Sequence, residues 1–157
     1  MSKIIIQPKN PADITPGEAE KLAKAFCTAY PKYKVQVESN KGYALTSYAV
    51  TLYEVLTIVV VSAAAKEIVQ QVIKLTVDWA RERFKQKQSA RTTSITIYGP
   101  KGEVLKSLVV KNATDEPEDR TKEAVETEEI AKKYRKAPFW ETTYQRFKRR
   151  VSKLWLS

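Results

Sequence analysis

The sequence predicts an α+β fold: a single domain with a mixed sheet of about four strands packed on a long central helix, followed by two C-terminal helices. Three observations support this prediction. Short alternating or β-branched segments lie at both ends of the first 111 residues, an apolar segment with helical spacing (44–88) lies between them, and two further helical patterns follow. We expect a core domain over 1–111, an acidic linker over 112–120 and a helical extension over 121–157.

The first part of the chain predicts a strand, a helix and a second strand. Residues 3–7 form a short apolar run, and residues 33–38 alternate between apolar and polar side chains. Between them, Thr15 can cap a helix that has Pro16 in its first position, and Glu18 completes a capping box.

The middle of the chain, residues 44–88, predicts one long buried helix. Apolar side chains recur at helical spacing from Leu52 to Trp79, first in an almost uncharged run and then in an amphipathic one. The first half is also compatible with a membrane span, or with a buried strand at 57–61, where β-branched residues lower helix propensity. Glu54 argues against the span, because a carboxylate within the bilayer needs a partner or a pore.

The remaining elements are a hairpin and two helices. Residues 93–98 alternate, the Gly-Pro-Lys-Gly sequence at 99–102 predicts a turn, and residues 103–111 predict the return strand. Residues 121–136 are acidic at their start and basic at their end, which matches a helix dipole. A last, basic amphipathic helix is expected from Phe139 onward.

The net charge of +10 arises from 28 basic and 18 acidic residues that are unevenly distributed. Residues 1–111 hold 17 basic and 9 acidic side chains, residues 112–131 hold 2 and 8, and residues 132–157 hold 9 and 1. This asymmetry indicates an anionic partner, such as nucleic acid, a membrane surface or an acidic protein face. The alternative is that the acidic connector folds back on the chain's own basic surface.

The residue types available for catalysis are few. The chain has no histidine, which removes the commonest general base and most zinc sites. We expect its single cysteine, Cys27, to be a small core residue rather than a nucleophile. The absence of a second cysteine and of a secretory signal predicts a cytoplasmic protein without an internal disulfide.

Three carboxylates are candidates for a metal-dependent nuclease site. Asp78 and Glu82 lie four residues apart on the expected helix and could hold Mg²⁺ together with Glu54, whereas no other cofactor is expected. The alternative is that Asp78 and Glu82 pair with neighbouring arginines on a solvated face. For Glu54 we expect either a buried structural group bonded to a tyrosine or lysine, or a functional group with a raised pKa.

Two basic clusters are candidate binding surfaces for nucleic acid or a partner. The first comprises Arg81, Arg83, Lys85, Lys87 and Arg91. The second is interleaved with aromatic residues and comprises Trp140, Tyr144, Arg146, Phe147, Lys148, Arg149, Arg150, Lys153 and Trp155. Such residues can neutralise phosphates and stack on bases, and a basic amphipathic helix also suits a membrane surface or a partner's groove. Alternatively, the aromatic stripe packs on the domain's own sheet.

Several segments of the first 111 residues resemble a known family. They are Leu52-Tyr-Glu-Val-Leu56, the expected small-residue helix through Ala63-Ala-Ala65, Trp79-Ala-Arg81 with the basic residues that follow it, and Ile95-Thr-Ile-Tyr-Gly-Pro-Lys-Gly102. Together they resemble the effector-associated constant component family, small α+β modules encoded with effectors in bacterial conflict systems. The resemblance implies a non-catalytic adaptor.

The leading expectation is therefore a non-enzymatic protein-interaction module of a prokaryotic antiviral or conflict system, with a protein partner. The alternatives are a basic nucleic-acid-binding protein, which with Mg²⁺ would be a nuclease, and a peripheral membrane protein held through residues 139–155. The sequence does not fix the oligomeric state.

Overall fold

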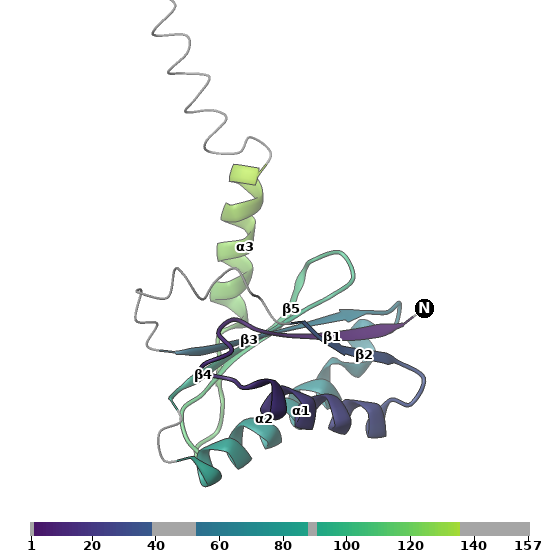
Figure 1. The fold of residues 1–157 in the computed structure, drawn as a ribbon. Helices are drawn as coiled ribbons and strands as arrows, with labels where there is room; N and C mark the ends of the chain where they lie inside the picture. The colour runs from purple at the N-terminus through teal and green to yellow at the C-terminus, as the bar shows by residue number, and fades with distance from the viewer. Residues whose placement is uncertain (1, 39–52, 88–90, 136–157) are drawn as a thin grey trace, which may run out of the picture. The chain divides into compact units, whose positions relative to one another are not determined.

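The computed structural model describes residues 2–38, 53–87 and 91–135, and Figure 1 shows its α+β fold. In chain order the elements are β1 (Lys3–Pro8), α1 (Pro16–Ala29), β2 (Lys34–Val37), β3 (Glu54–Val61), α2 (Ala65–Gln86), β4 (Thr93–Tyr98), β5 (Val104–Val110), β6 (Glu118–Asp119) and α3 (Thr121–Arg135). The chain forms two compact units, Met1–Ala124 and Val125–Ser157. The first unit contains the whole sheet.

The sheet is mixed and has the strand order β2-β1-β3-β4-β5-β6. Helix α1 connects the parallel strands β1 and β2, and α2 connects the parallel strands β3 and β4, whereas β1 and β3 are antiparallel. The two crossovers thus start from antiparallel strands, β1 and β3, and run toward opposite edges of the sheet. If both have the usual right hand, both helices must lie on the same face, which is where Figure 1 shows them.

The core lies between this face of the sheet and the two helices. Alternate residues of the central strands are fully buried, for example Leu56, Ile58 and Val60 of β3. They pack in one cluster with buried side chains of the helices, including Phe26 of α1 and Val72 of α2. The residues between them, such as Val59, are half-buried on the opposite face.

The predicted long helix is wrong. Its described part divides into strand β3 and helix α2, joined at residues 62–64, and residues 44–52 lie outside the described part. The buried strand weighed for 57–61 is the alternative that the structure confirms, and it begins earlier, at Glu54. The physical reason is the β-branched run from Thr57 to Val61, which fits a central strand better than a helix.

The other predicted elements in the described residues are confirmed with small shifts of boundary. In α1, the Glu18 N–H donates to Thr15 Oγ1 at 3.3 Å and Glu18 Oε2 accepts from the Thr15 N–H at 3.2 Å, so the capping box is present. The predicted strand count of four is wrong, because β3 and β6 make a six-stranded sheet. Strand β6 lies in the predicted acidic linker, and the predicted helix from Phe139 lies outside the described residues.

No helix in the described ranges has the length and apolar character needed to cross a membrane.

Two glycines of the first unit should respond oppositely to alanine. Gly102, in the β4–β5 turn, has φ 75°, so Gly102→Ala should destabilise the protein by about 1 kcal/mol. Gly17, in the first turn of α1, has open space where the methyl group of alanine would lie, so Gly17→Ala should stabilise by about 0.5 kcal/mol. Urea unfolding measures the change in unfolding free energy for both variants. No change for Gly102→Ala would contradict the expected strain in the turn.

Candidate functional site

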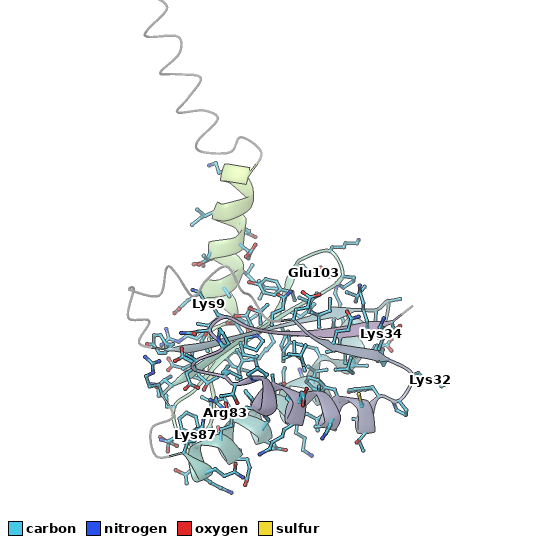
Figure 2. The ribbon with its side chains drawn as sticks, viewed as in Figure 1. Lys9, Lys32, Lys34, Arg83, Lys87 and Glu103 are labelled. Carbon is cyan, nitrogen blue, oxygen red and sulfur yellow. The ribbon has the colours of Figure 1, made fainter. Side chains whose placement is uncertain are left out.

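A buried arginine joins α1, α2, β3 and the loop before α1 at one end of the first unit. Arg83, near the C-terminus of α2, is 5% exposed. Its Nη1 donates to Glu54 Oε2 at 2.7 Å and its Nε donates to Glu18 Oε2 at 3.2 Å. Its Nη2 donates to the carbonyl of Asp13 at 3.0 Å. We call Arg83, Glu18 and Glu54 the buried ion network; Figure 2 labels Arg83 and Lys87 on neighbouring turns of α2.

The topology explains why these groups meet. Glu54 and Thr93 are the first residues of the parallel strands β3 and β4 and lie opposite each other in the sheet. Helix α2 returns the chain from the end of β3 to the start of β4, so its C-terminal turns lie beside both residues. Thr93 Oγ1 donates to Glu54 Oε2 at 3.4 Å, which gives this buried carboxylate a second donor.

Glu18 comes to the network from the first turn of α1. Trp79 Nε1 donates to the Glu18 carbonyl at 2.9 Å, and the Arg83 guanidinium lies 5.0 Å from the centre of the Trp79 ring. Lys87 forms a salt bridge with Glu18 Oε1. The end of α2 is therefore held to the start of α1 by charged, polar and cation–π contacts together.

The charge environment lowers the pKa of Glu18 below its ordinary value of 4.5. Burial acts to raise this pKa, but the hydrogen bond from Lys87, the charge of Arg83 and the N–H of Thr15 together outweigh it. The carboxylate is thus kept ionised at neutral pH, as a counter-ion for two cations.

This shift predicts an acid-sensitive contribution to stability. Because the pKa of Glu18 is lower in the folded state, its contribution is fully present above about pH 4.5 and is lost as the pH falls through the folded pKa. We expect Glu18→Gln to flatten the decline of unfolding free energy below pH 4.5, measured by urea unfolding at a series of pH values. Glu20→Gln, an exposed position on the same helix, is the control and should leave the decline unchanged; equal slopes for wild type and Glu18→Gln would contradict the prediction.

A groove of about 560 Å³ lies between α1 and α2, next to the buried ion network. Its apolar lining comes from Ala25, Leu75 and Trp79, and its exposed polar lining from Lys21, Asp78, Glu82 and Gln86. Glu18, Arg83 and Lys87 complete the lining. We call this the α1–α2 groove, and we call Asp78 and Glu82 its acidic rim.

A second cavity, of about 650 Å³, lies on the other side of α2, toward β5 and β6. Its charged lining comes from Lys74, Asp78, Arg81, Lys106, Glu116 and Asp119, and Lys106 forms a salt bridge with Asp119. Hydrogen bonds from Lys106 and then from Thr121 lower the pKa of Asp119 to about 2.

The structure separates the three predicted metal-binding carboxylates by environment. Asp78 and Glu82 are exposed on the groove, whereas Glu54 is buried and bonded to Arg83 and Thr93 rather than to the tyrosine or lysine that we expected. Among the described residues, no three carboxylate or cysteine side chains are grouped so that they could hold a metal ion. In the same ranges, Asp78 and Glu82 do not form the predicted ion pairs with arginines; Glu82 instead accepts a hydrogen bond from Gln86 at 3.3 Å.

Most of the first basic cluster has partners within the protein. Arg83 is buried in the ion network, Lys87 pairs with Glu18, and Arg91 pairs with Asp13. Arg81 donates from Nη2 to the carbonyl of Asp115 at 3.1 Å, and Lys85 is exposed. The second basic cluster, at 140–155, lies outside the described residues.

Sequence reasoning missed the ion pairs of Glu18, the hydrogen bond of Trp79 and the burial of Arg83. One signal was present: Val72, Thr76, Trp79 and Arg83 follow one another at spacings of three or four, which places the arginine on the buried stripe of α2. The prediction for Cys27 is also wrong, because this residue is exposed on α1, one position from the buried Phe26.

No protein-family model, no curated protein and no solved structure matches this chain.

Proposed function

We propose that this chain is a non-enzymatic protein-interaction module that holds a segment of a partner protein in the α1–α2 groove. The observation that carries the proposal is the composition of the groove, in which Leu75 and Trp79 supply apolar surface beside exposed charged groups. Grooves between helices with this composition suit an amphipathic peptide segment. Tryptophan is among the residues that most often dominate binding energy at interfaces.

The buried ion network supports the same function. It holds the end of α2 against the start of α1, so the walls of the groove keep their spacing when the groove is empty. A preformed site avoids part of the entropic cost of association. In this proposal Glu54 and Glu18 shape the site and carry out no chemistry.

We further propose that the setting is a prokaryotic antiviral or conflict system and that the protein acts in the cytoplasm. The support is the resemblance of segments in its first 111 residues to the effector-associated constant component family, which implies a non-catalytic adaptor. The confirmed β4–β5 hairpin contains one of the segments that carry the resemblance.

Affinity capture with the full chain tests the proposed function. Ala25→Arg places a long side chain in the groove, and Ala29→Arg, an exposed position on the same helix, is the matched control with equal charge. After nuclease treatment, we expect wild type and Ala29→Arg to retain a protein that Ala25→Arg does not retain. Circular dichroism checks that all three proteins are folded. If Ala25→Arg retains every captured protein, the proposal is wrong.

Nucleic-acid binding is the second candidate, and the net charge of +10 favours it. It predicts binding of DNA or RNA with a steep dependence on salt, which becomes shallower when Arg149 and Arg150 are replaced by alanine. If the protein is a nuclease, cleavage needs Mg²⁺ and is lost in Asp78→Asn or Glu82→Gln. Anisotropy with labelled oligonucleotides at low salt measures the binding, and no binding there ends this candidate.

Attachment to a membrane surface through residues 139–155 is the third candidate, favoured by the aromatic and basic residues of that segment. Flotation with anionic vesicles tests it. Flotation that does not depend on Trp140 and Trp155 would exclude that mode of attachment.

A further inference from the structure

We infer that the α1–α2 groove binds a basic amphipathic helix of the partner protein. Two basic residues of that helix, four positions apart, contact the acidic rim, and an apolar residue between them packs on Leu75 and Trp79. The inference rests on the proposed function and adds the chemistry of the partner.

The acidic rim is the first argument. Asp78 and Glu82 lie one helical turn apart on α2, and both are exposed. Within the ranges that the structure describes, neither forms a salt bridge with a cation. Like charges at this spacing repel each other, and cations of a ligand at the same spacing relieve the repulsion.

The apolar lining is the second argument. Trp79 is 9% exposed, and its ring is fixed by the hydrogen bond to the Glu18 carbonyl and by the Arg83 guanidinium. Leu75 lies one turn before it and is half-buried. An apolar side chain from a ligand therefore meets a rigid surface, so little conformational entropy is lost there on binding.

The length of the groove fits a short helix. The lining residues of α2 extend from Leu75 to Gln86, which corresponds to about 17 Å of helix at 1.5 Å per residue. A ligand helix of about three turns spans this distance and can carry one pair of basic residues four positions apart.

Lys21 makes the α1 side of the groove differ in charge from the acidic rim. It is exposed on α1, across the groove from the acidic rim. A basic residue placed beside Lys21 would meet a like charge, whereas beside Asp78 and Glu82 it meets two carboxylates. At the end of α2 the groove also has Lys87, which is paired with Glu18. The pattern therefore selects both the charge of the ligand and the face that it presents.

The test uses the full chain and two synthetic helical peptides in fluorescence anisotropy. One peptide carries two arginines four positions apart around a leucine and a tryptophan, and the other carries glutamates in place of the arginines. Because the protein has a net charge of +10, overall electrostatics favours the glutamate peptide, so tighter binding of the arginine peptide reports the local charge of the groove. We expect the arginine peptide to bind more tightly by about tenfold.

Reversing the acidic rim should reverse this preference. In Asp78→Lys with Glu82→Lys, we expect the arginine peptide to bind at least about tenfold more weakly and the glutamate peptide to bind more tightly. Glu20→Lys with Glu67→Lys changes the net charge equally at exposed positions outside the groove and should alter the affinity less than about twofold. Unchanged binding of the arginine peptide after rim reversal would overturn the inference.

Two further outcomes separate this inference from the proposed function. Suppose that capture finds a partner that Ala25→Arg does not retain, but that reversing the charge of the acidic rim does not change the affinity for the arginine peptide. In that case only the assignment of a basic helix is wrong. If no captured protein depends on Ala25, the proposed function is wrong and this inference is wrong with it. Tighter binding of the arginine peptide by full-length Arg146→Glu, Arg150→Glu than by the equally charged control Lys32→Glu, Lys34→Glu would overturn the assignment to a partner, because the chain's own C-terminal segment would then be the competitor.

Discussion

Replacing Arg83 with methionine is expected to lower the free energy of unfolding by about 3–5 kcal/mol. The substitution keeps an apolar stem of similar length but removes the cation that neutralises Glu54. That carboxylate is buried, and Thr93 Oγ1, at 3.4 Å, is then its one hydrogen-bond donor among the described residues. A buried charge without its partner is among the few changes that cost this much. Urea unfolding followed by tryptophan fluorescence and by circular dichroism measures the loss.

Two variants show whether the loss comes from the unpaired charge. Lys85→Met removes an exposed cation two positions along the same helix and should cost less than about 0.5 kcal/mol. Arg83→Met combined with Glu54→Leu removes both charges, and we expect it to recover part of the stability, since an apolar pair of similar volume often replaces a buried ion pair without loss. Recovery should be incomplete, because Glu18 and the Asp13 carbonyl also lose a donor.

A cost below about 1 kcal/mol for Arg83→Met would contradict the role of this network in holding α1, α2 and β3 together. In that event the α1–α2 groove would lack its rigid end wall and would not be a preformed site. Stability and peptide binding measured on the same variant therefore connect the network to the proposed function.

Local signals in the sequence were sufficient for much of the fold. Thr15, Pro16 and Glu18 specify the start of α1 through contacts within four residues, so no tertiary information was needed. The turn at Gly99–Gly102 was equally readable, because Gly102 adopts a positive φ that glycine tolerates best. The residues of β4 alternate before this turn, and β5 pairs with β4 after it, with one register shift between Ile97 and Tyr98.

The buried ion network was not predictable in the same way. Glu18 and Glu54 are separated from Arg83 by 65 and 29 residues, and only the two crossovers bring them together. A wrong assignment of β3 as helix moves Glu54 to another element, so the network could not be assembled from the predicted fold. The groove was missed for the same reason, since it requires α1 and α2 as neighbours on one face of the sheet.

Strand β3 was misread because both of its faces carry apolar residues. Val55, Val59 and Val61 are half-buried on one face, while Leu56, Ile58 and Val60 are buried on the other. Such a run has no clear period of two, and a helix can be drawn through it. Composition should have decided the matter, because five consecutive β-branched residues, from Thr57 to Val61, disfavour a helix.

A pair of identical substitutions in β3 is expected to differ strongly in effect. Val60 is fully buried against the helices, so Val60→Ala should cost about 2–3 kcal/mol from lost burial and the cavity left behind. Val59, its neighbour, is half-buried on the opposite face, and Val59→Ala should cost less than about 1 kcal/mol. The change in side chain is the same, so the difference in urea unfolding isolates the face on which each residue lies.

Alanine substitutions at the neighbouring positions Thr57 and Ile58 distinguish a strand from a helix in this segment. In a strand, alanine at Ile58 should be costly like alanine at Val60, and alanine at Thr57 should be mild like alanine at Val59, since side chains alternate between faces. In a helix, the side chains of Thr57, Val60 and Val61 would lie on one face. The free-energy cost of alanine substitution would then recur every three or four residues. Equal costs at Val59 and Val60 would contradict the alternation, and with it the position of β3 between β1 and β4 on which the buried ion network and the groove depend.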